Sequence, residues 1–116
     1  MNLLFLDDER FPDEVLWIPA KYYSTCTAIQ MVRTSEVFYE KLTEGKWDVI
    51  SFDNDIQEVI EGYELLKFAC GFWITKPELV PDKIILHTMN TIAKENMFTY
   101  IENFKKVFNV EIEVVL

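Results

Sequence analysis

Two short apolar segments of this chain run directly into clusters of polar and mostly acidic residues. They are residues 3–6, followed by Asp7, Asp8 and Glu9, and residues 49–52, followed by Asp53, Asn54 and Asp55. If both segments are parallel neighbouring strands, about 4.8 Å apart, their carboxyl ends bring these side chains into one small volume. Such a cluster either binds a cation or raises the pKa of some of its own members.

Further segments have the apolar or partly alternating pattern of strands, and helical patterns separate most of them. We predict strands over residues 2–6, 27–32, 47–52, 83–86 and 110–116, and helices over 36–43, from 62 to about 72, and over 93–108. Thr34 or Ser35 is expected to cap the first of these helices. Pro12 and Pro19 lie between the first two strands, so this connection should contain at most a short helix.

Strands joined by helical crossovers predict a parallel sheet with right-handed connections and helices on both faces. We therefore expect a single domain over residues 1–116 with a doubly wound α/β fold. Its five-stranded parallel sheet should have the order 2-1-3-4-5, and its first helix should be reduced. In this topology ligands bind at the carboxyl ends of strands one and three, which are the two ends that carry the acids.

The charge of the chain limits its partners. A net charge of −9, from 20 acidic and 11 basic residues, disfavours tight nonspecific binding to long nucleic acids because the phosphates repel it. A small phosphate ligand remains possible if a metal ion or a few arginines cancel the local field. No apolar run approaches the roughly 20 residues that span a bilayer, and nothing resembles a signal peptide. We expect a cytoplasmic protein that does not associate with membranes.

The acidic cluster predicts a magnesium site, because Mg²⁺ prefers carboxylate and water oxygens. We expect Asp8 and Asp53 to hold the ion, with Asp7 as the next candidate ligand. Asp7 or Asp55 would otherwise position the waters of the ion or the attacking water. His87, the only histidine, follows the fourth predicted strand and could transfer a proton on the same rim. A lone histidine is nevertheless more often structural.

Two arginines and two polar side chains are candidate substrate-binding residues. Arg10 follows the first acidic run and Arg33 follows the second strand, so both could grip a phosphate. Either could instead pair with a carboxylate. Thr88 and Asn90, next to His87, could hold substrate oxygens or the imidazole ring, or could simply form a turn.

The order of these pieces resembles a receiver domain with a flavodoxin-like fold, although the last predicted strand has no lysine to contact a phosphorylated aspartate. A closer resemblance, over nearly the whole length, is to the cyclic-phosphate-processing receiver domains. Asn54 stands where this family leads us to expect a histidine. The matching segments are residues 6–12, 32–34 with Glu36, 52–56, 62–63, and 87–90 with 95–97. The family name implies action on cyclic phosphates, such as RNA ends with a 2′,3′-cyclic phosphate.

Three functional hypotheses follow. The first is a Mg²⁺-dependent phosphoesterase-like domain that acts on a cyclic phosphate at an RNA end or in a small cyclic nucleotide, with the metal polarising a phosphoryl oxygen. The second is a non-catalytic receiver-like module that binds a protein or nucleotide partner through the same rim. The third is a phospho-accepting receiver that is modified at Asp53.

Overall fold

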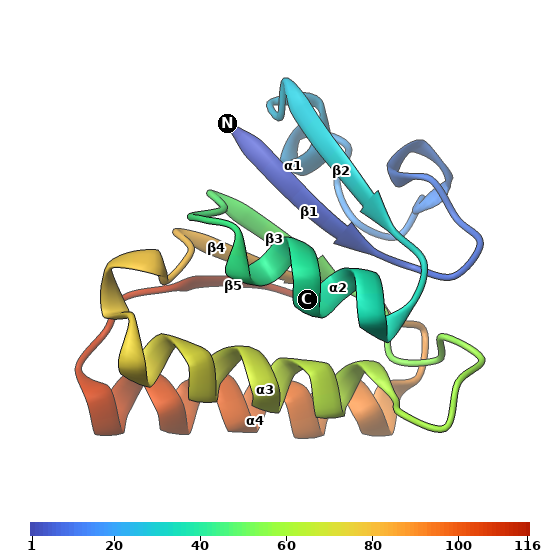
Figure 1. Cartoon of the computed structure of the whole chain (residues 1–116). Coiled ribbons are helices and arrows are strands. Elements are labelled where there is room, and N and C mark those ends of the chain that lie inside the picture. The colour runs from blue at the N-terminus through green and yellow to red at the C-terminus, as the bar shows by residue number, and fades with distance from the viewer.

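A five-stranded, entirely parallel sheet forms the centre of the protein in a computed structural model that describes residues 1–116 (Figure 1). Its strands lie in the order β2-β1-β3-β4-β5. The strands are β1 (Asn2–Leu6), β2 (Ala28–Val32), β3 (Val49–Phe52), β4 (Lys83–Leu86) and β5 (Glu113–Val115). The α-helices are α1 (Lys21–Ser24), α2 (Ser35–Thr43), α3 (Gly62–Thr75) and α4 (Thr91–Phe108), and two short 3-10 helices are η1 (Pro12–Glu14) and η2 (Pro77–Leu79).

The two faces of the sheet are covered very differently. Helices α2, α3 and α4 lie together on one face, where they enclose a cluster of 20 buried apolar residues (Figure 1). The other face is covered only by the connection between β1 and β2, which contains η1 and the four-residue α1, and its cluster has 9 buried residues. Alternation along β1 divides its side chains between these layers, because successive residues of a strand point to opposite faces. Leu4 and Leu6 belong to the larger cluster, and Leu3 and Phe5 to the smaller one.

The predicted fold is confirmed in its topology, its parallel pairing and its reduced first helix. Helix α2 begins one residue earlier than predicted, and Thr34 rather than Ser35 is its cap: the Thr34 hydroxyl accepts a hydrogen bond from the Val37 amide (3.3 Å). Helix α4 begins two residues earlier than predicted, at Thr91, because the side chain of Asn90 caps it.

The last strand is shorter than predicted: β5 covers Glu113–Val115 instead of residues 110–116. Helix α4 ends at Phe108, its C-cap Asn109 adopts a left-handed conformation (φ 53°), and the Val110 amide then donates to the Lys105 carbonyl (3.1 Å). Residue 110 therefore completes the end of the helix, as is common at left-handed C-caps.

The third strand also begins later than predicted. Trp47 packs against α2 instead, and its indole N–H donates to the Lys41 carbonyl (2.9 Å).

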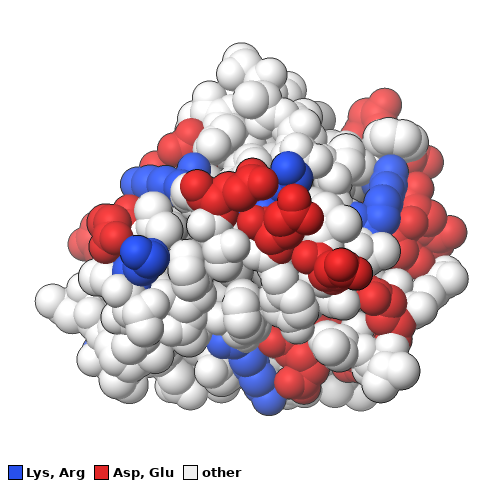
Figure 2. Space-filling model, viewed as in Figure 1, with Lys and Arg blue, Asp and Glu red and all other residues white.

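Acidic side chains dominate the surface that carries α2. Figure 2 shows them in a band with few lysines or arginines between them, as the net charge of −9 leads one to expect. Such a surface repels polyanions. None of the helices has the length and apolar character needed to cross a bilayer.

Helix α3 begins directly against the backbone at the end of β3. The Gly62 amide donates to the Asn54 carbonyl (2.8 Å), and a Cβ at position 62 would overlap the carbonyl oxygen of Asp53. The overlapping atom belongs to the backbone, so no side-chain rotation can relieve the contact. The absence of a side chain at Gly62 thus allows α3 to begin this close to the segment that carries Asp53.

This contact predicts opposite effects for alanine at the two glycines of α3. Gly62→Ala should destabilise the protein by about 1–3 kcal/mol, the usual range for overpacking. Gly71→Ala is the matched control: no atom lies near its Cβ position, so the variant should gain about 0.5–1 kcal/mol from the lower backbone entropy of the unfolded chain. Urea denaturation measures both changes. Equal stability of the two variants would contradict the close approach of α3 to Asp53.

Candidate functional site

The carboxyl ends of three adjacent strands place Asp7, Asp53 and His87 side by side. Leu6 and Phe52 are register partners at the ends of β1 and β3, and the ladder continues past them. The Asp53 amide donates to the Leu6 carbonyl (3.0 Å), and the His87 amide donates to the Phe52 carbonyl (3.0 Å). One ligand atom from each of the three side chains lies within 4.8 Å of the other two. The rim predicted from the sequence therefore exists, and all three side chains are buried.

Asp7 is the most extensively hydrogen-bonded member of this group. Its Oδ1 accepts from the amides of Glu9 (3.0 Å) and Arg10 (2.9 Å), and its Oδ2 lies 3.1 Å from His87 Nε2. Burial alone would raise the pKa of Asp7, but these hydrogen bonds outweigh it and lower the pKa from 3.8 to about 2. Asp7 is thus ionised near neutral pH, and since a carboxylate only accepts, His87 donates from Nε2.

Asp53 has the opposite pKa shift, although it lies next to Asp7. Burial is the main cause of its raised pKa, and the negative charge of Asp7 adds to the effect. The hydrogen bond from the Asn54 amide to Asp53 Oδ1 (2.8 Å) opposes the shift without cancelling it. Two neighbouring carboxylates with pKa values pushed apart are typical of functional sites. A cation bound between them would relieve their repulsion.

His87 belongs to a buried chain of hydrogen bonds that crosses the thinly covered face of the sheet. Its Nδ1 lies 2.7 Å from the Ser51 hydroxyl, which in turn lies 2.9 Å from the Tyr23 hydroxyl of α1. The imidazole also stacks on Phe5, with ring centroids 4.6 Å apart. Both ring nitrogens are therefore engaged, and none of the side chain is exposed to solvent. This arrangement fixes the orientation of the ring that donates to Asp7.

The connection between β1 and β2 is fastened to the same rim. Trp17 donates its indole N–H to the His87 carbonyl (2.7 Å), and the Arg10 guanidinium lies 5.2 Å from the centre of the Trp17 ring. Nη1 of Arg33 donates to the backbone carbonyls of Asp7 (3.0 Å) and Arg10 (2.6 Å). Arg10 itself keeps a loose ion pair with Asp7 (3.8 Å) and is one-third exposed. Of the two predicted arginines, Arg10 thus lies beside the acids, whereas Arg33 holds the loop.

The remaining predicted residues surround the group without joining it. Asp8 is half-buried and lies outside the cluster, and Asp55 is exposed. Thr88 is buried, and its hydroxyl accepts from the Asn90 amide (3.2 Å). Asn90 Oδ1 accepts from the Ala93 amide (3.0 Å) as the cap of α4. The contact of Thr88 fits the turn considered as the alternative for these last two residues, whereas the cap formed by Asn90 was not predicted.

Tyr23 and Ser51 were not predicted from the sequence, although one signal was available. A serine inside an otherwise apolar strand, two residues before Asp53, must face the same side as Asp53. Tyr23 could not be placed, because nothing in the sequence gives the path of the β1–β2 connection.

Asn54 also has a defined role. Its Oδ1 accepts from the Tyr63 amide (3.0 Å), which caps the first turn of α3, and its Nδ2 donates to Asp55 (3.2 Å).

Comparison with known proteins agrees with this fold. The sequence matches the family described as "Cyclic-phosphate processing Receiver domain" over residues 2–103. The chain belongs to this family. The match includes all three strand ends that form the rim. No curated protein matches the chain at a significant level.

Receiver domains of solved structure share the fold. The response regulator TrrA from Thermotoga maritima, crystallised in complex with Mg²⁺-BeF, has a TM-score of 0.58 and 21% sequence identity, covering 99% of this chain and 84% of that chain. A CheY-like response regulator receiver domain protein from Methanospirillum hungatei has a TM-score of 0.52 and 16% identity, covering 93% of both chains. At these identities the comparison establishes a receiver fold for this family member.

The opposite pKa shifts predict opposite effects for two asparagine variants in metal-free buffer. The ionised form of Asp7 stabilises the native state above pH 3.8, by about 2 kcal/mol, and this contribution is lost as the pH falls through about 2. The raised pKa of Asp53 means that its charge destabilises the native state near neutral pH and that protonation at lower pH relieves this. At pH 7, Asp7→Asn should therefore lower the melting temperature and Asp53→Asn should raise it, with both differences shrinking in acid. Thermal melts that shift in the same direction would refute the assignment.

The cap at Asn90 can be tested separately from any role in binding substrate. Asn90→Ala should destabilise the protein by about 1 kcal/mol, because the Ala93 amide loses its acceptor, whereas Asn90→Ser should retain most of the stability. Guanidinium denaturation of both variants measures the difference. A stability equal to that of the wild type in Asn90→Ala would show that the cap contributes nothing and would favour a binding role for this side chain.

Proposed function

We propose that this protein is a Mg²⁺-dependent phosphoesterase-like domain that opens a cyclic phosphate, such as the 2′,3′-cyclic phosphate of an RNA end or of a small nucleotide. The observation that carries the proposal is the pair of buried carboxylates, Asp7 and Asp53, at adjacent strand ends. The chain belongs to a family described as processing cyclic phosphates, which supports the substrate class. A magnesium complex of a receiver with the same fold supports the choice of metal.

The donor atoms of the rim fit a magnesium ion. Mg²⁺ prefers a few carboxylate oxygens and completes its shell with water, whereas a nitrogen donor is unfavourable by comparison. The imidazole of His87 is already bonded on both sides, so the carboxylates are the natural ligands. Asp7 and Asp53 would hold the ion, and Asp8, which follows Asp7 in the chain and is half-buried, is the proposed third ligand. When bound, the ion would polarise a phosphoryl oxygen.

The reaction is the addition of water to phosphorus with cleavage of one of the two ring P–O bonds, which leaves a phosphomonoester and a free hydroxyl. Arg10 is placed to neutralise the substrate phosphate because its guanidinium lies beside Asp7 and is partly exposed. Arg33 engages one nitrogen with the loop backbone, so it would contribute through its other N–H groups. Asp55, exposed next to the rim, is the proposed acceptor for the proton of the attacking water.

His87 is assigned a positioning role in this proposal. A general acid or base must come within hydrogen-bond reach of the reacting atoms, and the His87 side chain has no exposed surface. Its contribution is to hold the carboxylate of Asp7 in one orientation and to favour its ionised form. Proton transfer by His87, which the sequence suggested, would require the rim to open.

The complete burial of the His87 side chain favours a second candidate function. A rim without an exposed imidazole is compatible with a receiver-like module that binds a phosphorylated small molecule, a nucleotide or a protein partner without turnover. The same acids and Arg10 would then bind ligand and metal together. Retention of an intact cyclic phosphate by the protein distinguishes this candidate from the phosphoesterase.

The two candidates differ in one measurement. An RNA oligonucleotide ending in a 2′,3′-cyclic phosphate, and free 2′,3′-cyclic AMP, would be incubated with the protein with and without Mg²⁺ and followed by ³¹P NMR. The phosphoesterase should convert the cyclic signal to a monoester signal only when Mg²⁺ is present. Signals that shift without conversion would favour the binding module, and the absence of both changes would reject both candidates.

Metal binding itself is tested by thermal melting. Mg²⁺ at about 100 times its dissociation constant should add about 2.7 kcal/mol to the native state. Asp53→Asn should abolish this increase, whereas Asp82→Asn, which removes an exposed carboxylate away from the rim, should retain it. An unchanged response in Asp53→Asn would remove Asp53 from the proposed ligand set.

A further inference from the structure

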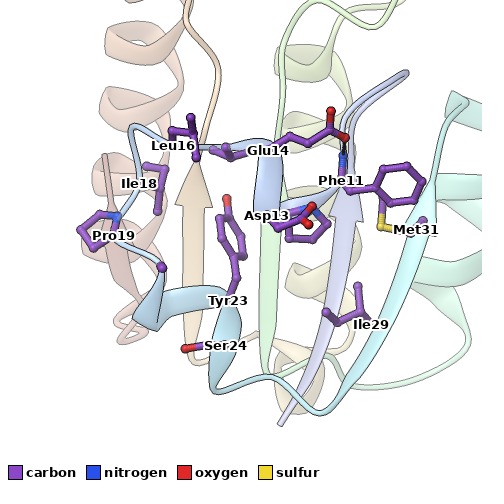
Figure 3. Close-up of a pocket in the computed structure, with 13 residues that line it drawn as sticks. Phe11, Asp13, Glu14, Leu16, Ile18, Pro19, Tyr23, Ser24, Ile29 and Met31 are labelled. Atoms are coloured by element: carbon purple, nitrogen blue, oxygen red, sulfur yellow. Dashed lines mark hydrogen bonds between the residues drawn. The ribbon is translucent and has the colours of Figure 1, made fainter.

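The thinly covered face of the sheet contains an apolar hollow of about 870 Å³ (Figure 3). Ile29 and Met31 stand on β2 at one side of it, and Ile18 and Tyr23 lie across from them on the β1–β2 connection. Eight of its 13 lining residues are hydrophobic. This volume falls within the range of small-molecule pockets, roughly 300–1,000 Å³, which are mostly apolar with a few polar groups.

The hollow has a simple physical origin. Helix α1 has four residues and is therefore about 6 Å long, whereas the five-residue strands β1 and β2 extend about 16 Å. The helix cannot cover both strands, and the outer strand β2 keeps its apolar side chains near solvent. Ile29 is 44% exposed, and Leu16, which also lines the hollow, is 85% exposed. Contiguous apolar surface of this kind usually marks a binding site.

Both charged residues that line the hollow are acidic. Asp13 and Glu14 are exposed and belong to its lining, which contains no lysine, arginine or histidine. Glu14 also accepts a hydrogen bond from the Phe11 amide (2.8 Å), which orients its carboxylate and leaves its charge in place. With a net charge of −9 on the whole chain, the field at this hollow attracts cations and repels anions.

We propose that this hollow binds a small apolar molecule that carries a positive charge, such as an aromatic or aliphatic amine. The apolar body would lie against Ile29, Met31 and Ile18. The ammonium group would lie near the carboxylates of Asp13 and Glu14. This site is separate from the acidic rim and needs neither Mg²⁺ nor catalytic turnover.

Tyr23 provides a built-in reporter of occupancy. Its side chain lines the hollow, and its hydroxyl begins the hydrogen-bonded chain through Ser51 to His87. A molecule that packs against Tyr23 therefore acts on the environment of the imidazole. His87 is the only histidine, so its ring signals in an NMR spectrum are assigned without ambiguity.

Three probes with the same apolar body test the proposal: phenylbutylamine, phenylbutanol and phenylbutyrate, which are cationic, neutral and anionic at neutral pH. Titration of the whole protein in metal-free buffer, followed by NMR, should give saturable shifts of the Ile29 methyl and His87 ring signals. The amine should bind roughly two- to fivefold more tightly than the alcohol, the range expected for exposed charge pairs, and the carboxylate should bind most weakly. Failure of all three probes to saturate these signals, or equal affinities for them, would overturn the proposal.

Paired variants locate the site. Ile29→Lys places a competing cation in the hollow and should abolish amine binding, whereas Ile92→Lys, at an exposed position on α4, should leave it unchanged. Asp13→Asn should reduce the preference for the amine over the alcohol, and Glu111→Gln, which removes a carboxylate outside the hollow, should preserve that preference. Amine binding that survives Ile29→Lys would place the ligand elsewhere and reject the assignment.

Discussion

The alignment of three parallel strands at one level is the constraint from which the rest of this site follows. Parallel register places the residues after β1, β3 and β4 next to one another, and the two-residue period of a strand directs them to one face. Polar residues in those positions must share a buried volume. The sheet thereby sets both the proximity of Asp7, Asp53 and His87 and the energetic cost of that proximity.

Hydrogen bonds more than offset this cost for Asp7 but do not offset it for Asp53. Two backbone amides and an imidazole stabilise the charge of Asp7. The imidazole is held by Ser51 and Tyr23 in turn, so a tyrosine on α1 helps to determine the state of a carboxylate at a strand end. Fewer hydrogen-bond donors contact the carboxylate of Asp53, so of the two acids it would be stabilised more by a bound cation.

The sequence was sufficient to predict the parallel pairing, which follows from local apolar patterns and the right-handedness of crossovers. The strand order, and with it the rim, followed from assuming a common doubly wound topology. This prediction correctly brought Asp53 and His87 together. It ranked Asp8 ahead of Asp7 as a ligand, whereas Asp7 is the residue that the structure brings to Asp53 and His87: a shift of one residue exchanges the face to which a side chain points, and the register that decides this belongs to the folded sheet. The sequence also could not reveal the roles of Arg33 and Asn90. The same type of side chain can bind a phosphate or hold a loop, and only the folded structure shows which carbonyl or amide lies within its reach.

The unequal covering of the two faces has a consequence for how this domain can diversify. The larger core is built by α2, α3 and α4 and does not include the β1–β2 connection, whereas that connection contacts the rim through Trp17, Tyr23 and Arg10. Insertions and replacements there should alter specificity while leaving the main scaffold folded. Divergence among relatives, and the effort of an engineer who wishes to redirect the site, should therefore concentrate in this segment.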